Sequence, residues 1–207
     1  MMKVLGKAPS INVRKVLWTL AEIGVPYERE DWGDGFRPTQ TPEFLALNPN
    51  AMVPVLVDGG FVLWESNTIC RYLAGVHCRG DLLPAEPRAR AQVEKWMDWQ
   101  ATDLNTAWRY PFMSLVRRNP AYQDPAQLAA SVGSWNRNIG ILERHLEQGS
   151  AFVAGEEFTL ADIVLGLSAN RWQMTLSERP FTPAIDAWME RMAERQGFAE
   201  HCRNGMP

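Results

Sequence analysis

The segment VPVLVDGGFVLWES, residues 53–66, limits the possible folds of this chain more than any other stretch. Its apolar runs at 55–57 and 61–64 flank an Asp-Gly-Gly turn signal, which predicts an antiparallel β-hairpin. A hairpin alone explains neither Pro54, which precedes the first run, nor the polar pair Glu65-Ser66 that follows the second. We therefore expect these three positions to serve a purpose beyond the fold.

The N-terminal third of the chain alternates short strands with helices around this hairpin. A crossover between parallel strands, followed by an antiparallel hairpin, predicts a small mixed sheet covered by helices. The periodicity and the turn signals predict, in order, a strand at 3–6, a helix from Ser10 to Gly24, a strand at 27–31, a helical turn at 43–47, the hairpin, and a helix at 66–76.

The character of the sequence changes after residue 78. The segment RGDLLPAEP at 79–87 contains two prolines, a glycine and mixed charges, as expected of a linker. Beyond it, strand signals are few. We expect a small α/β domain at 1–78, the linker at 79–87, and an all-helical domain at 88–207, with helical periodicity at 88–118, 125–148, 160–176 and 183–195.

The segment FTLADI marks a helix start within the helical part of the chain. Thr159 is placed to cap the helix, and Asp162 follows it by three residues, as in a capping box. Phe158 and Ile163 have the spacing of a hydrophobic staple. We interpret this segment as structural.

Composition argues against several classes of function. The formal net charge is −3 and no basic block stands out, so a nucleic-acid partner is not expected. No apolar run approaches the roughly 20 residues of a membrane helix, and the N-terminus lacks the apolar core of a signal peptide. The three cysteines form no regular framework, so we expect a reducing cytoplasm: Cys70, Cys78 and Cys202. The three histidines are dispersed and lack the spacing of metal ligands, so no metal site is expected: His77, His145 and His201.

Three segments carry a family resemblance: SINVRKVLW at 10–18, NPNAMVPVLVDGGFVLWESNTICRYLA at 48–74, and FTLADI at 158–163. In this order and spacing they resemble the cytosolic glutathione transferase family, and the resemblance covers almost the whole chain. It implies a thioredoxin-like N-terminal domain and an all-α C-terminal domain. It also implies glutathione as co-substrate with no other cofactor, a homodimer, and transfer of glutathione to small hydrophobic electrophiles.

The resemblance assigns the hairpin positions to glutathione. The Val53–Pro54 bond would be cis, and the Val53 backbone would pair with the cysteinyl backbone of glutathione. Ser66 would hold the glutamyl carboxylate at a helix N-terminus, where unpaired N–H groups favour an anion, and Glu65 would pair with the glutamyl ammonium group. Without the resemblance, the residue pattern indicates only that Pro54 starts a strand, with a trans bond, and that Ser66 caps a helix.

By the same resemblance, Ser10 and Asn12 face the thiol. The pKa of a free thiol is near 8.5, and lowering it by about two units requires roughly 2.7 kcal/mol of preference for the anion. A hydroxyl donor at a helix N-terminus supplies about 1.5–3 kcal/mol. We expect Ser10 to contribute most, with Asn12 second. The alternative is that Ser10 only caps the helix and Asn12 is an exposed first-turn residue.

Two further sets of residues are predicted less directly. The loop at 32–41 would lie over the glycine end of glutathione, with Arg37 and Gln40 as the candidates for its carboxylate, although such residues are often only solvated. Met52 departs from the polar residue that some classes of the family carry. Aromatic residues in the first helix after the linker would line the second-substrate pocket, with core packing as the alternative: Trp96, Trp99 and Tyr110.

Several functions fit such a chain. The first is a glutathione transferase. The second is a glutathione-binding protein of this fold with little catalysis, and isomerase or dehalogenase activity on the same site is a further alternative. A thiol–disulfide oxidoreductase or glutathione-dependent reductase is a third alternative, which the serine at position 10 disfavours because such an enzyme would prefer a cysteine there.

Overall fold

The N-terminal part of the chain folds as a four-stranded mixed sheet. The computed structural model describes all 207 residues. The strands lie in the order β2-β1-β3-β4, with β1 parallel to β2 and antiparallel to β3, and with β3 antiparallel to β4. Their bounds are β1 Met2–Leu5, β2 Tyr27–Glu30, β3 Val55–Asp58 and β4 Phe61–Trp64. The predicted mixed sheet and its hairpin are confirmed.

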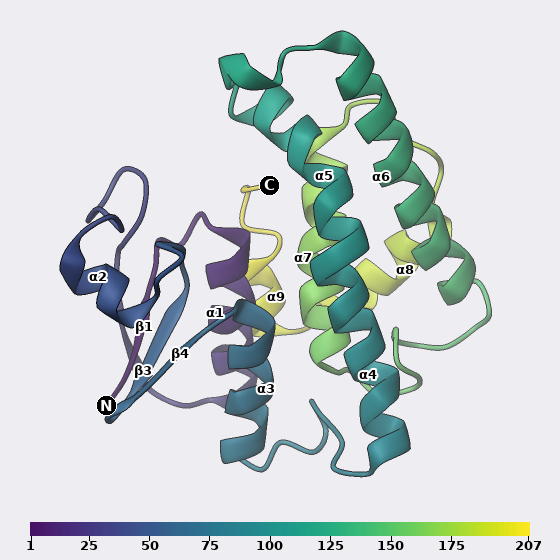
Figure 1. The fold of residues 1–207 in the computed structure, drawn as a ribbon. Helices are drawn as coiled ribbons and strands as arrows, with labels where there is room; N and C mark the ends of the chain where they lie inside the picture. The colour runs from purple at the N-terminus through teal and green to yellow at the C-terminus, as the bar shows by residue number, and fades with distance from the viewer.

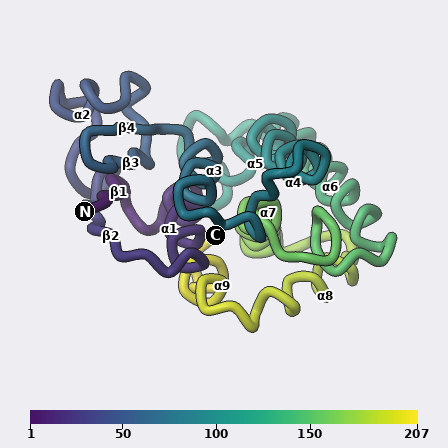
Figure 2. The backbone as a smooth tube through the Cα atoms, turned by 90° about the horizontal axis from the view of Figure 1, so that it is seen from below, coloured from purple at the N-terminus to yellow at the C-terminus, as the bar shows by residue number.

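Helices cover both faces of this sheet (Figure 1). Helices α1 (Ile11–Ile23) and α3 (Ser66–Val76) lie on one face, and the short α2 (Pro42–Leu47) lies on the other (Figure 2). Neighbouring strand residues point to opposite faces. Leu56 accordingly joins the large core on the α1 side, while Val55 packs with Phe44 of α2 on the other.

The C-terminal part is helical, as predicted. Helix α7 is buried on all sides from residue 160 to 172 and forms the centre, with α4, α5 and α6 beside it (Figure 1). The helices are α4 Pro87–Trp99, α5 Asn105–Pro111, α6 Pro125–Leu146, α7 Leu160–Thr175, α8 Pro183–Met192 and α9 Gln196–His201. None of them combines the length and apolar character needed to cross a bilayer.

The segment predicted as a linker, residues 79–87, connects α3 to α4. It is packed against the helical part, because Leu82 and Leu83 are buried and the Leu82 carbonyl accepts the Leu160 N–H at 3.0 Å. One core cluster of 40 buried residues runs from the α1 side of the sheet into the helices. The division into two domains at 79–87 therefore stays a prediction.

Two helices differ from the sequence-based expectation. The helix predicted at 88–118 contains two π-helical turns, at Gln100–Leu104 and Phe112–Val116, which widen it locally. The helix predicted at 183–195 ends at Met192, and the short α9 follows and packs against α1 (Figure 2). This packing is close, because a Cβ atom at Gly197 would overlap the Trp18 indole.

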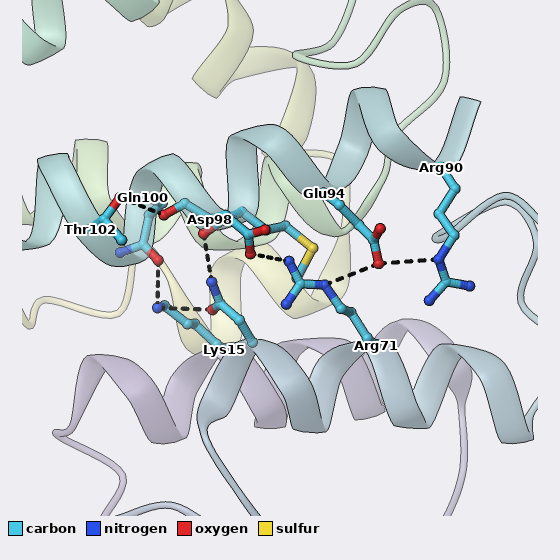
Figure 3. Close-up of polar contacts among 9 residues, drawn as sticks. Lys15, Arg71, Arg90, Glu94, Asp98, Gln100 and Thr102 are labelled. Atoms are coloured by element: carbon cyan, nitrogen blue, oxygen red, sulfur yellow. Dashed lines mark hydrogen bonds and ion pairs between the residues drawn. The ribbon is translucent and has the colours of Figure 1, made fainter. Parts of the chain in front are cut away.

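A buried lysine joins the sheet side of the molecule to the helical side (Figure 3). Lys15 of α1 is 2% exposed, and its ammonium group donates to Asn67 Oδ1 at 3.1 Å and to Gln100 Oε1 at 2.7 Å. Gln100 lies in the first π-helical turn. Beside this contact, Arg71 of α3 forms an ion pair with Glu94 of α4 at 3.4 Å. Polar contacts thus hold α1 and α3 against α4.

This lysine makes stability depend on pH. Burial lowers the pKa of Lys15 from 10.5 to about 8. Between these values the unfolded chain binds a proton that the folded chain has lost, so this residue adds stability as the pH rises. We expect the stability of the native protein relative to Lys15→Met to increase by about 1 kcal/mol from pH 8 to 9.

Denaturant unfolding of both proteins at each pH measures this difference. The buried thiols of Cys70 and Cys202 have raised pKa values and oppose the trend, but they are shared by both proteins and cancel. The exposed Lys95→Met variant is the control and should track the native protein. A difference between native protein and Lys15→Met that is constant from pH 8 to 9 would refute the assignment.

Candidate active site

The N-terminus of α1 opens the site with a free hydroxyl. Ser10 is the N-cap residue, with φ −74° and ψ 122°, and its carbonyl accepts the Arg14 N–H at 2.9 Å. Its side chain makes no capping hydrogen bond. The first N–H groups of a helix have no intrahelical partner and carry a partial positive charge. The Ser10 hydroxyl and these N–H groups can therefore donate to one anion.

Helix α3 begins beside this point. Ser66, its first residue, is 7% exposed, and its Oγ lies 3.4 Å from Asn12 Oδ1. Glu65 precedes it with φ 73°, a left-handed conformation that is uncommon for a residue other than glycine and costs on the order of 1 kcal/mol. The Glu65 side chain is exposed and does not cap the helix. Its carboxylate is thus available to a cation.

The segment before β3 completes the site. The Val53–Pro54 peptide bond is cis, as the resemblance implied. Neither the N–H nor the C=O of Val53 has a backbone partner within the chain. The buried Asn48 donates its side-chain amide to the Met52 carbonyl at 2.8 Å and so fixes the loop that leads into Val53.

Two adjoining cavities meet at these residues. A smaller one of about 120 Å³ is lined by Asn12, Val53, Pro54, Glu65 and Ser66, so the structure brings five of the predicted residues together. Asn48 and Asn50 also line it and were not predicted, although both stand in the quoted NPN segment.

A larger cavity of about 360 Å³ shares Asn12 and Val53 with the smaller one and adds Ser10. Its far wall comes from the helical part of the chain, through Trp108 and Phe112. A molecule that extends from one cavity into the other therefore passes the N-terminus of α1.

The aromatic residues predicted for the second-substrate pocket lie elsewhere. Trp96 is buried and packs edge-on against Trp99, with ring centroids 5.3 Å apart. Tyr110 stacks against Tyr122, and its hydroxyl accepts the N–H of Asp124 at 3.0 Å. None of Trp96, Trp99 and Tyr110 lines either cavity.

Trp108 and Phe112 line the larger cavity, the position that was predicted for Trp96, Trp99 and Tyr110. They are four residues apart and so lie on one side of the helix, with ring centroids 5.5 Å apart. The π-helical turn at Gln100–Leu104 shifts the helical register between Trp96 and Trp108. Trp99 also lies nine residues before Trp108, roughly 13 Å along a helix, so the two side chains reach different parts of the molecule.

The loop residues predicted for the glycine carboxylate line neither cavity. Arg37 is 62% exposed, pairs with Glu30 at 2.8 Å and lies 5.5 Å from the centroid of the Trp32 ring. Gln40 is exposed. From the same loop, Thr39 lines the larger cavity instead.

The fold is that of the glutathione S-transferase family, to which the chain belongs. Residues 1–75 match the model of the glutathione S-transferase N-terminal domain, and residues 105–196 match that of the C-terminal domain. The chain is 37% identical over 198 residues to glutathione S-transferase GstB of Escherichia coli, an alignment that covers 94% of each sequence.

Solved structures agree with this assignment. The theta class glutathione S-transferase of the citrus canker pathogen Xanthomonas axonopodis pv. citri, with glutathione bound, superimposes with a TM-score of 0.91 and 36% identity. That match covers 97% of this chain and 96% of the other.

A plant sequence is also similar. Glutathione S-transferase 3 of maize is 33% identical, in an alignment that covers 95% of this chain and 91% of the maize protein.

Proposed function

We propose that this protein conjugates the thiolate of glutathione to small electrophiles. The observation that carries the proposal is the uncapped Ser10 hydroxyl at the N-terminus of α1, in the wall of the larger cavity and two residues before Asn12, which lines both cavities. A hydrogen bond to a charged group contributes about 1.5–3 kcal/mol, and the helix terminus adds to it. This is enough to lower the pKa of a bound thiol by one to two units, since each unit is about 1.4 kcal/mol.

Glutathione would occupy the smaller cavity and extend toward Ser10. Its glutamyl carboxylate would accept the Ser66 hydroxyl and the first N–H groups of α3, and its ammonium group would pair with Glu65. The free N–H and C=O of Val53 suit the cysteinyl backbone. These contacts carry the sulfur to the α1 terminus.

The reaction itself requires only a positioned anion. The thiol proton leaves to solvent, and the sulfur attacks the electrophilic carbon. For an aryl halide, the carbon–sulfur bond forms, the carbon–halogen bond breaks, and the halide leaves with the bonding electrons. Ser10 would act by stabilising the thiolate, with Asn12 beside it, and no general base is involved.

The proposal extends to the glycine carboxylate of glutathione and to the oligomeric state of the protein. Arg37 and Gln40 stay candidates for the glycine carboxylate only if the exposed loop rearranges, because Arg37 is engaged by Glu30 and Trp32. We also propose a homodimer and a reducing cytoplasm, since the family resemblance implies the first and the free thiols suit the second.

Two measurements on the purified protein test the proposal. The protein is expected to be retained on immobilised glutathione and to accelerate the reaction of glutathione with 1-chloro-2,4-dinitrobenzene. Retention without turnover of this or other electrophiles would favour the alternative, a binding protein of the same fold. Lack of both retention and turnover would refute the proposal.

A further inference from the structure

The larger cavity contains a buried arginine that pairs with no aspartate or glutamate side chain. Arg171 of α7 is 3% exposed and lines this cavity. Its guanidinium carbon lies 4.3 Å from the Trp108 ring centroid and 4.1 Å from that of Phe112. Its Nη2 donates to the Pro207 carbonyl at 3.3 Å, whereas its Nε has no partner. Two aromatic rings thus hold a planar cation whose donors are mostly unused.

The charges around Arg171 are also mostly positive. Burial, together with the nearby Arg14 and Arg117, lowers the pKa of Arg171 from 12.5 to about 9, so the group is charged at neutral pH. Lys7 and Arg117 line the same cavity. Its one lining carboxylate, Asp34, lies 3.5 Å from Lys7 and 3.8 Å from Arg117 and is largely exposed. No aspartate or glutamate therefore compensates Arg171, and the main-chain oxygen of Pro207 that it contacts lies closer to Arg14, at 2.5 Å against 3.3 Å.

We propose that the electrophile used by this protein carries an anionic group, such as a carboxylate, which Arg171 binds while Trp108 and Phe112 contact the apolar body. A guanidinium presents paired N–H donors that match the two oxygens of a carboxylate. A neutral electrophile would fill the same space and leave a buried cation unpaired. This inference rests on the proposed function, and it narrows the substrate class.

Binding of two conjugates that differ only in charge tests this inference. One is glutathione linked through sulfur to the ring of 3,5-dinitrobenzoate, at the carbon opposite the carboxylate, and the other is the corresponding carboxamide. The carboxylate conjugate is expected to bind about 30-fold more tightly by isothermal titration calorimetry, the range typical of a charge-assisted hydrogen bond. Equal affinities in the native protein would overturn the inference.

Variants test whether Arg171 is responsible for the preference for the carboxylate conjugate. Arg171→Gln should remove most of the roughly 30-fold preference, while Arg171→Lys should keep part of it because it keeps the charge. Arg179→Gln is the matched control, because Arg179 also stacks on a tryptophan, Trp172, but lines neither cavity. A preference that survives Arg171→Gln would overturn the assignment. Retained affinity for glutathione itself shows that a variant is folded.

The same preparations separate this inference from the proposed function. The parent compounds, 4-chloro-3,5-dinitrobenzoate and its carboxamide, are assayed with glutathione, and each rate is divided by the uncatalysed rate. Turnover without a preference for the carboxylate conjugate would overturn the anionic substrate and leave the transferase intact. A preference in binding without turnover would support the anion site and contradict the transferase. Failure of both conjugates to bind would overturn the inference.

Discussion

Alanine at position 162 is expected to lower the free energy of unfolding by about 4 kcal/mol. Asp162 is fully buried, and its carboxylate accepts N–H groups from Val153 at 2.9 Å, Thr159 at 2.8 Å and Trp188 Nε1 at 2.9 Å. Each donor left without a partner costs about 1–3 kcal/mol. Removing the carboxylate also removes the cost of burying it, and this offsets part of the loss.

Denaturant unfolding measures this effect, with two comparisons. Asp162→Asn keeps one accepting oxygen but turns an amide toward donors, so about half of the destabilisation is expected. Asp186→Ala removes an exposed carboxylate that accepts one side-chain bond, from Gln173, and should change stability by less than about 0.5 kcal/mol. If Asp162→Ala were as stable as Asp186→Ala, the buried network would not hold α7 to its neighbours as described.

Replacing Ser10 with alanine is expected to lower kcat/KM about 30-fold at pH 6.5. The Ser10 hydroxyl has no hydrogen-bond partner within the protein, whereas the Asn12 side chain is oriented by its amide oxygen, which accepts the Ser66 hydroxyl at 3.4 Å. We therefore expect a smaller loss, about fivefold, for Asn12→Ala. The loss should shrink as the pH approaches 9, where the free thiol ionises without help.

Steady-state kinetics with 1-chloro-2,4-dinitrobenzene across pH 6 to 9 checks this order. Ser177→Ala, an exposed serine outside both cavities, is the control for the substitution itself. A larger loss of kcat/KM for Asn12→Ala than for Ser10→Ala would make Asn12 the main residue that stabilises the thiolate. Unchanged kinetics in both variants would contradict thiolate stabilisation at this helix.

Local signals predicted the parts of the fold and site that depend on short segments. The hairpin, the helix starts and the positions of Pro54, Glu65 and Ser66 follow from residues close together in sequence, and the structure brings these three into one cavity. Asn48 was missed within the same quoted segment, because its role, holding the Met52 carbonyl, depends on how the loop closes.

Buried charge and helix register could not be predicted in this way. Lysine and arginine side chains are mostly exposed in proteins, so nothing in the residue pattern marked Lys15 and Arg171 as buried. Yet α7 is buried all round and α1 is covered by both α3 and α9. Only tertiary packing encloses these two cations. Likewise, Trp108 lines the larger cavity and Trp96 and Trp99 do not, although all three stand in one helical stretch of the sequence. Trp99 lies nine residues before Trp108, roughly 13 Å along a helix, and which of them reaches the cavity depends on how the helix is placed against α1.

The pKa of the thiol in the complex with glutathione tests the central claim most directly. Ultraviolet absorbance of the thiolate, followed as a function of pH with the protein saturated by glutathione, gives this value. Stabilisation by Ser10 and the α1 terminus predicts a pKa near 6.5, about two units below that of free glutathione thiol. A pKa near 8.5 in the native complex would contradict the account.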